Sequence, residues 1–386
     1  MSKSKKLHKN ILLLGTADDC PDIEYATGFR SLDPVIFLQK GKKGYLVVPE
    51  FEQGRALKAN THRRISSRSG HTIEVLTPLS LGMGRKRHKS LSFNMLRLLE
   101  KTGTKSIKIP FSFPYGIAGS LIRAGIRVSV LENEVFPERA VKTMEEIKMI
   151  KESQQAAVIA MRAATAMIAD ATADSAGFLK IQGKRLTSEA VKQVISRILV
   201  EHNCFCREII VAGGLQAADP HVCGKGPLRL GEAIVIDIFP QHMEHGYWGD
   251  LTRTVIKGKP SRNLRKMYQA VKSAQSIALN HVKAGVKCST VHQCAVKEFE
   301  RRDFQSEVIN GRREGFVHST GHGVGLAIHE SPSLVAQEDR LRSGNVITVE
   351  PGLYYSNIGG IRIEDTVVVT PKGWRYLVPC EKKFEL

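Results

Sequence analysis

Four segments in the second half of the chain are largely apolar and strand-like, yet each carries one carboxylate. Side chains alternate between the two faces of a strand, so in the segment 233–239 three isoleucines share one face and Asp237 points to the other. A carboxylate in such a strand is costly unless it is paired or bound to a metal. The four predicted strands are 233–239 with Asp237, 247–257 with Asp250, 346–350 with Glu350 and 361–370 with Glu364. Because the pattern recurs, it favours one shared site; solvent-facing positions on half-exposed antiparallel sheets are the alternative.

A histidine motif in the same region strengthens the case for a metal site. His318, His322 and His329 fall within twelve residues, and glycines surround the middle histidine. Glycine permits backbone conformations that are closed to other residues and allows close approach to a ligand. A single histidine is more often structural than metal-binding, but this spacing indicates a metal ligand at His322.

The charges of these residues are balanced by two divalent ions. Four ionised carboxylates carry a charge that two divalent cations neutralise, and a neutral His322 completes the donor set. Oxygen-rich ligation with one imidazole suits Mn(II), Co(II), Fe(II) or Zn(II), and the sequence does not choose among them. Such a site holds its ions ~3.5–4 Å apart and produces hydroxide from water at neutral pH. The sequence therefore predicts a two-metal hydrolytic centre.

A chain of 386 residues is expected to form two domains. Residues 1–140 alternate short apolar runs with helical stretches, which predicts a small α/β domain. Residues 141–386 group helices against antiparallel strand pairs, which predicts an α+β domain. The first domain is expected to contain strands at 11–15, 35–39, 45–48, 73–76, 106–109 and 128–131 and helices at 51–59, 91–101 and 116–124. The second is expected to add a strand at 208–212 and helices at 143–171, 186–201, 262–283 and 290–302.

The formal net charge of +19 is concentrated in the first part of the chain. Two basic clusters there could hold nucleic acid or an anionic membrane surface. No aromatic residues interleave with them, as a platform for single-stranded nucleic acid would need. A solvated basic surface is therefore the favoured interpretation. The clusters are Arg63, Arg64 and Arg68, and Arg85, Lys86, Arg87 and Lys89.

Cysteine usage and hydropathy favour a cytoplasmic protein without a membrane segment. The seven cysteines are scattered and form no CxxC pair, so a thiolate zinc site is not expected. No apolar run approaches the ~20 residues that span a bilayer. The apolar run 11–14 near the N-terminus is shorter than the ~7–15 residues of a secretory signal.

Five stretches together resemble the pita-bread metallopeptidases, namely prolidase, aminopeptidase P and their relatives. They are VIDIF around Asp237, GDLTRT around Asp250, HSTGHGVGLAIHE around His322, VITVEPGLYY around Glu350 and GGIRIEDT around Glu364. Methionine aminopeptidases share the catalytic domain but generally lack the first domain. The segment YATGFRSLDPVIFL resembles the prolidase-type N-terminal domain. The resemblance implies a creatinase-type α/β domain at 1–140 and a pita-bread catalytic domain at 141–386.

The resemblance also implies a role for each residue. Asp237 would bind one metal, His322 would bind the other, and Asp250 and Glu364 would bridge the two. Glu350 would bind metal and shuttle a proton while a bridging hydroxide attacks the scissile carbonyl. His221 would contact substrate and His329 would stabilise the tetrahedral intermediate. Arg362 would support the site beside Glu364 and contribute to substrate binding, and His318 would do likewise or be structural.

The chain departs from the family pattern between the first two aspartates. Asp237 and Asp250 lie thirteen residues apart, where the family usually has eleven. An even difference keeps both carboxylates on their intended faces if the extra residues lie in the turn 241–246. The side chains of His242, Glu244 and His245 are then either a solvated hairpin tip, which is favoured, or part of the substrate site. A second departure is Cys223, close after His221.

The function that this resemblance implies is hydrolysis of the bond between an N-terminal residue and a following proline. Whether the substrate is a dipeptide or a longer peptide stays open, and Mn(II) is the first expectation for the metal. A homodimer is expected by analogy with the family, and neither membrane nor nucleic acid is expected as a partner. The alternatives are a non-catalytic binding protein that uses its basic first domain and a creatinase-like hydrolase.

Overall fold

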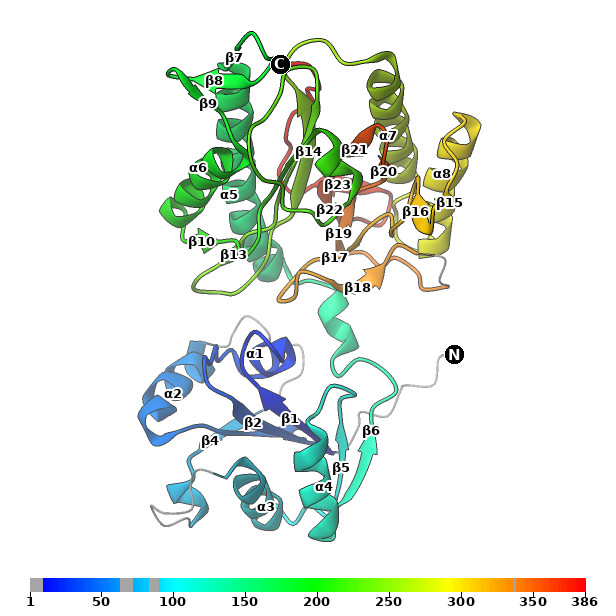
Figure 1. Cartoon of the computed structure of the whole chain (residues 1–386). Coiled ribbons are helices and arrows are strands. Elements are labelled where there is room, and N and C mark those ends of the chain that lie inside the picture. The colour runs from blue at the N-terminus through cyan, green and yellow to red at the C-terminus, as the bar shows by residue number, and fades with distance from the viewer. Residues whose placement is uncertain (1–9, 63–71, 83–89, 336–337) are drawn as a thin grey trace. The chain divides into compact units, whose positions relative to one another are not determined.

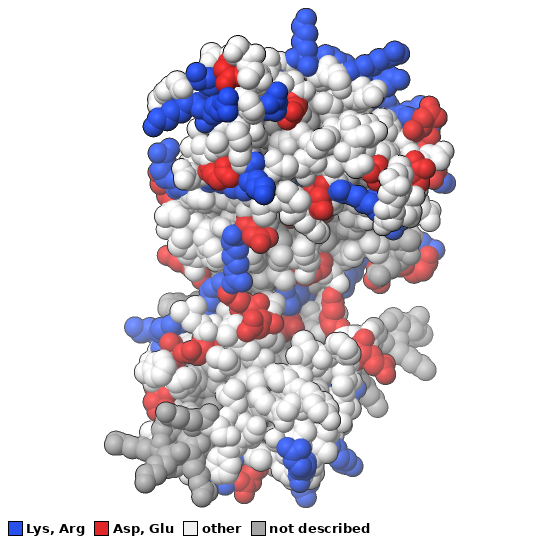
Figure 2. Space-filling view, viewed as in Figure 1, with Lys and Arg blue, Asp and Glu red and all other residues white. Residues whose placement is uncertain are grey.

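The computed structural model describes residues 10–62, 72–82, 90–335 and 338–386, of which residues 60–62 are described by backbone alone. Both predicted basic clusters, at 63–68 and 85–89, lie outside these ranges. The chain divides into two compact units, Met1–Arg139 and Ala140–Leu386, and the division falls one residue from the expected boundary. On the face of the second unit that Figure 2 shows, lysine and arginine side chains lie among acidic ones.

The first unit is a mixed six-stranded sheet with helices on both faces (Figure 1). Alternate residues of β1 point into different cores, so Leu12 packs with helices α3 and α4 while Ile11 and Leu13 pack with α1 and α2. The strand order is β4-β3-β2-β1-β5-β6. The strands are β1 (Asn10–Gly15), β2 (Val35–Lys40), β3 (Lys43–Val47), β4 (Thr72–Leu76), β5 (Ser106–Ile109) and β6 (Arg127–Val130), and the helices are α1 (Pro21–Thr27), α2 (Gln53–His62), α3 (Leu91–Lys101) and α4 (Tyr115–Arg123).

The predicted elements of this unit are present, and the short helix α1 was not expected. It begins with Pro21 at its first turn and ends at Gly28, whose backbone has φ of 69°. Seven residues are too few to show a clear 3.6-residue period, so sequence periodicity gave no signal there.

The second unit places helices on two sides of a set of antiparallel strands (Figure 1). Helices α5 and α6 pack with the isoleucines of β12, and α7 and α8 pack with the strands that follow. The helices are α5 (Met144–Ala169), α6 (Ser188–Glu201), α7 (Arg262–Asn280) and α8 (Cys288–Arg301). The strands that carry the candidate site are β11 (Ile210–Gly213), β12 (Ala233–Ile238), β13 (Gln241–His242), β14 (Leu251–Ile256), β17 (His322–Gly323), β19 (Val346–Val349), β21 (Gly359–Arg362) and β22 (Asp365–Val369).

The remaining strands of this unit are short, and the sequence gave no clear signal for most of them. They are β7 (Thr172–Ala173), β8 (Leu179–Ile181), β9 (Lys184–Arg185), β10 (Cys204–Phe205), β15 (Glu307–Ile309), β16 (Arg312–Glu314), β18 (Glu330–Ser333), β20 (Gly352–Tyr355) and β23 (Trp374–Tyr376). In the described part of the chain, no helix is long and apolar enough to cross a membrane.

The alternative of solvent-facing carboxylates is wrong. Every residue of β12 and of β14 is buried, so both faces of these strands are covered. Asp237 lies within β12, and Asp250, one residue before β14, is 5% exposed, so both carboxylates sit inside the protein and need a partner there.

The expected strand 361–370 is also wrong, because the chain breaks it in two. Residues Gly359–Arg362 pair with β20, and Asp365–Val369 pair with β19. Glu364 lies at the break, where its backbone N–H donates to the carbonyl of Thr252 at 3.1 Å. Asp250 and Glu350 likewise lie beside strand ends, one residue before β14 and one after β19. Residues just outside a ladder can turn their side chains toward a common point, which strand alternation alone does not predict.

Helix α5 begins with a capping box that can be tested separately. The Oγ1 atom of Thr143 accepts from the N–H of Glu146 at 3.2 Å, and the Glu146 carboxylate accepts from the N–H of Thr143 at 2.7 Å. We expect Thr143→Ala to lower the free energy of unfolding by about 1 kcal/mol, because it leaves a helix N–H unsatisfied. Thr165→Ala is the matched control on the same helix, since its hydroxyl only bonds the carbonyls of Met161 and Arg162. Denaturant titration of the second unit's transition should place the control within about 0.5 kcal/mol of the wild type; an equal loss in both variants would contradict the capping role.

Candidate metal centre

The five predicted metal ligands come from five positions in the second unit and meet in a buried site. Ligand atoms of Asp250, His322 and Glu364 all lie within 4.8 Å of one another. The Nε2 atom of His322 is 3.3 Å from Oε1 of Glu350 and 3.6 Å from Oδ2 of Asp250. Asp237 is near enough for its charge to raise the pKa of both Asp250 and Glu364. The structure thus brings together the residues that the sequence pattern selected.

Strand register connects Asp237 to the rest of the site. Asp237 lies opposite Thr252 in the antiparallel pair of β12 and β14. The hydroxyl of Thr252 donates to Oε2 of Glu364 at 2.8 Å. The pairing of Asp237 with Thr252 therefore fixes the spacing between the carboxylates of Asp237 and Glu364.

Helix α5 holds the backbone of Asp250. The side-chain oxygen of Gln154 accepts from the Asp250 N–H at 2.7 Å, and its Nε2 donates to the Asp250 carbonyl at 2.8 Å. The same carbonyl accepts from the hydroxyl of Thr366 at 2.8 Å. Gln154 is fully buried in an alanine-rich helix, and a buried amide needs such partners, but its burial cannot be read from the sequence.

The glycines around His322 are explained by close backbone contacts. A Cβ atom at residue 321 would lie 2.0 Å from the carbonyl oxygen of Thr348, and one at residue 323 would lie 2.3 Å from that of Ser331. The backbone N–H of His322 donates to the hydroxyl of Thr348 at 3.0 Å. Nδ1 of His322 lies 3.1 Å from the Gly323 carbonyl, which only accepts, so Nδ1 carries a proton and Nε2 faces the carboxylates.

The electrostatics of the site fit bound cations. Burial and the charges of Glu350 and Asp237 raise the pKa of Glu364 to about 8. Burial and the neighbouring carboxylates also raise the pKa of Asp250 well above its usual value. Burial opposes the charged form of His322, but its hydrogen bond with Glu350 and the charges of Glu350 and Glu364 prevail and raise its pKa to about 9. Like charges in a buried site produce such shifts, and divalent ions would remove them.

One oxygen of Asp237 supports the same conclusion. Its Oδ2 accepts from Nη2 of Arg362 at 2.7 Å. Its Oδ1 is buried and has no hydrogen-bond partner among the residues that the structure describes. A buried acceptor without a donor is expensive, and a metal ion at this atom would satisfy it.

Arg362 is engaged with protein groups on every side-chain nitrogen. Besides Asp237, it donates from Nη1 to the hydroxyl of Tyr354 at 2.8 Å and from Nε to the hydroxyl of Thr252 at 3.2 Å. It is 4% exposed. It thus contacts Asp237 and Thr252 directly, whereas the sequence pattern had placed it beside Glu364. Tyr354, which sequence reasoning missed, links this arginine to His318.

The three other histidines differ in their surroundings. The ring of His329 meets that of His322 edge to face, with centroids 4.4 Å apart. His318 uses both ring nitrogens on protein atoms, Nε2 at 2.9 Å from the Tyr354 hydroxyl and Nδ1 at 2.7 Å from the Ser319 carbonyl. Burial lowers the pKa of His318 and His329, and the charge of the exposed His221 lowers both further. His318 and His329 are therefore close enough to be affected by the charge of Glu350, and His221 is close enough to affect both of them.

The segment between Asp237 and Asp250 is not simply a solvated hairpin tip, as had been favoured. Met243 and Glu244 are exposed, but Gln241 and His242 are buried. The backbone N–H and the indole N–H of Trp248 donate to the carbonyls of Gly325 and Leu326, at 2.9 and 3.2 Å. The longer segment is therefore tied to the loop that follows His322.

Comparisons with known proteins identify a family of peptidases. The model of metallopeptidase family M24 matches residues 148–371. A Xaa-Pro dipeptidase of Pyrococcus horikoshii is 31% identical over 370 residues, which are 94% of this chain and 92% of the relative. A prolidase structure from the same species aligns with a TM-score of 0.77 and 26% identity over 97% of this chain and 95% of that one. A Xaa-Pro dipeptidase structure from Bacillus anthracis aligns with a TM-score of 0.79 and 25% identity over 98% of this chain and 95% of that one.

A buried carboxylate cluster around one histidine, held between antiparallel strands and covering helices, defines a metal-dependent hydrolase. The chain belongs to metallopeptidase family M24, whose model matches more than half of its residues. The predicted pita-bread fold and the predicted class, a metallo-exopeptidase, are confirmed.

Binding of metal ions should release protons, because the raised pKa values keep protons on the ligands of the metal-free protein. At pH 7 the metal-free protein holds a proton on Glu364, with a pKa of about 8, and an extra one on His322, with a pKa of about 9. Both groups must lose these protons to bind a cation, and Asp250, whose pKa is also raised, must be ionised as well, so we expect at least two protons released per chain at pH 7. The release should become smaller as the pH rises above both values. Calorimetry of Mn(II) binding in buffers with different ionisation enthalpies measures this number; a release that does not depend on pH would contradict the assignment.

Proposed function

We propose that the chain hydrolyses the bond between an N-terminal residue and a following proline in dipeptides or short peptides. The convergence of Asp250, His322 and Glu364 carries the proposal, because such a donor set suits divalent ions that act on water and carbonyl groups. The Xaa-Pro dipeptidase that aligns with 94% of the chain supports the choice of substrate. A dipeptide is therefore the first substrate to test.

The proposed ligands of two divalent ions are Asp237, Asp250, His322, Glu350 and Glu364. Mn(II) is the first expectation, and Co(II), Zn(II) and Fe(II) are the alternatives. Four carboxylates facing two divalent ions, with a neutral imidazole, give a balanced charge. When bound, the ions supply hydroxide from water at neutral pH and polarise the scissile carbonyl.

Glu350 is held ionised and in one orientation beside His322. Burial opposes its ionisation, but the hydrogen bond and charge of His322 prevail and lower its pKa to about 2. The hydroxyl of Thr348 donates to the same oxygen, Oε1, at 3.3 Å. This lowering depends on a protonated His322, so with His322 neutral on a bound cation the Glu350 carboxylate would be a stronger base, which could accept the proton of the attacking water and return it to the leaving nitrogen.

The histidines would act on the substrate side. The lowered pKa keeps His329 neutral at pH 7, so that it can donate a hydrogen bond to an oxygen that becomes negative during the reaction. His221 is exposed and free to contact a peptide. Arg362 would position Asp237 rather than touch the substrate, because it is buried and its nitrogens already donate to protein atoms.

The assembly and the location in the cell are proposed from the family resemblance and from the cysteines. A homodimer, with a creatinase-type first domain that limits substrate length, is proposed from the family resemblance. A cytoplasmic location is proposed from the free cysteines, all seven of which are unpaired in the structure.

The decisive assay is hydrolysis by protein that has been stripped with a chelator and reloaded with Mn(II), Co(II) or Zn(II). We expect metal-dependent cleavage of Xaa-Pro dipeptides, less of Xaa-Pro-Yaa tripeptides, and none of Met-Ala peptides or creatine. Cleavage of tripeptides alone would make the chain an aminopeptidase P, and hydrolysis of creatine alone would favour the creatinase alternative. No metal-dependent cleavage of any of these would contradict the proposal.

Glu350→Gln tests the proton-shuttling role within that assay. It keeps the shape of the side chain but cannot accept a proton, so we expect kcat to fall by roughly 10²–10⁴-fold. Metal content, measured by mass spectrometry, controls for loss of an ion. Glu338→Gln, at an exposed carboxylate that pairs with Lys287, is the control and should leave kcat unchanged. Wild-type kcat in a metal-loaded Glu350→Gln protein would refute the role.

A further inference from the structure

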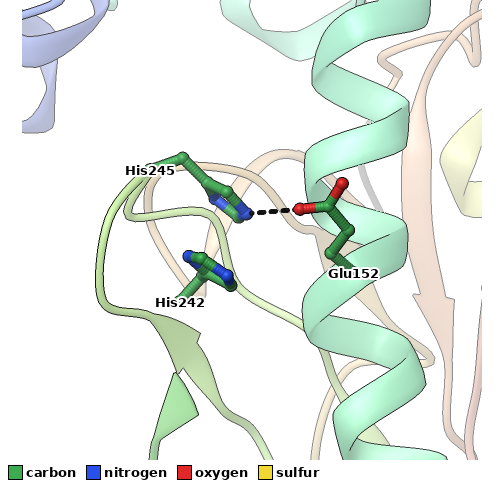
Figure 3. A group of neighbouring side chains, drawn as sticks. All are labelled: Glu152, His242 and His245. Carbon is green, nitrogen blue, oxygen red and sulfur yellow. Dashed lines mark ion pairs between the residues drawn. The ribbon is translucent and has the colours of Figure 1, made fainter. Parts of the chain in front are cut away.

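A second group of metal-ligating side chains lies outside the proposed catalytic centre and shares no residue with it. Glu152 projects from helix α5 toward His242 and His245 of the segment that joins β12 to β14 (Figure 3). One ligand atom from each of the three residues lies within 4.8 Å of the others. Two imidazoles and one carboxylate from two different elements therefore meet at one place.

The geometry of this group is partly organised already. Nε2 of His245 is 3.4 Å from Oε2 of Glu152, the contact that Figure 3 marks with a dashed line. The rings of His242 and His245 are stacked, with centroids 3.8 Å apart and planes 8° from parallel. His242 is 8% exposed, whereas the Glu152 side chain is 42% exposed. The group thus combines a buried ring with a carboxylate that solvent, and an ion in it, can reach.

One ring has to turn for both histidines to bind the same ion. Parallel stacked rings cannot direct both of their nitrogen lone pairs at one point. In the structure, Nδ1 of His242 accepts from the N–H of Glu244, and Nδ1 of His245 accepts from the N–H of Tyr247, each at 3.2 Å. Both contacts are at the long end of the hydrogen-bond range. His245, which lies in the turn and is less buried than His242, is the ring that we expect to turn.

We propose that Glu152, His242 and His245 bind a third divalent transition-metal ion, for which Zn(II) is the best match. Imidazole nitrogen with carboxylate oxygen suits Zn(II), and three protein ligands leave a fourth position for water. The ion would join the longer Asp237–Asp250 segment to helix α5. Two histidines of this segment thus face the helix.

The ion would reinforce contacts that already lie beside it. Ser153, next to Glu152, donates from its hydroxyl to the Tyr247 carbonyl at 2.8 Å, and Gln154 holds the backbone of Asp250. A Cβ atom at residue 249 would lie 2.6 Å from the backbone nitrogen of Gln154, so helix and segment are in close contact here. A bound ion at Glu152 would therefore stabilise the region that positions Asp250 without touching the substrate.

The test counts zinc in protein that carries no affinity tag. In an Asp250→Asn/Glu364→Gln background, which disables the proposed catalytic centre, we expect about one zinc per chain after desalting. Adding His245→Ala or Glu152→Gln to that background should raise the Kd for zinc at least tenfold. His281→Ala is the matched control, since this exposed histidine only contacts the carbonyl of Ile277. Zinc should also raise the melting temperature of the background protein and of the control, and not of the His245→Ala protein.

Because the count is made without the catalytic centre, its outcome is separate from whether the chain cleaves peptides. X-ray absorption at the zinc edge of the background protein should report two imidazole ligands. Zinc binding that is equal with and without His245 and Glu152, or no zinc in the background protein, would overturn the proposal. Circular dichroism of each variant identifies one that fails to fold, and Glu152→Gln, on the exposed side of a helix, provides the second variant in that case.

Discussion

Four carboxylates gathered in one buried site repel one another, and the surrounding structure is organised around that repulsion. Two like charges about 4 Å apart repel by roughly 4 kcal/mol even at an effective dielectric constant of about 20. The raised pKa values of Asp250 and Glu364 and the raised pKa of His322 are the response of the metal-free protein to this field. Protons reduce the repulsion in the absence of metal, and divalent cations would remove it.

The fold keeps these groups together despite the repulsion by fixing their backbones from several sides. The β12–β14 ladder aligns Asp237 with Thr252, which in turn binds Glu364. Helix α5 holds the peptide groups of Asp250 through Gln154. Arg362 neutralises part of the charge of Asp237, but no residue that the structure describes gives the second oxygen of Asp237 a hydrogen bond. The result is a site that is held in shape before any ion enters, as hydrolysis by oriented water requires.

Much of this site could be predicted from the sequence, because four apolar segments with one carboxylate each recur beside a histidine motif. The same reasoning failed at Glu364, since a break between β21 and β22 depends on contacts with β14 that no local pattern reveals. Gln154 and Tyr354 were missed because a buried polar side chain is identified only by what it touches. The buried His242 was misinterpreted as part of a solvated turn, since turn composition says nothing of what packs on it.

The most direct test of the account is anomalous diffraction from crystals of the Mn(II)-loaded protein, recorded on both sides of the manganese edge. The account predicts two peaks ~3.5–4 Å apart, both in contact with the carboxylates of Asp250 and Glu364. One of them should lie next to Oδ1 of Asp237, and the other next to Nε2 of His322. A single peak, or peaks that leave Asp237 and Glu364 without metal, would contradict the claim that divalent ions resolve the repulsion among the buried carboxylates.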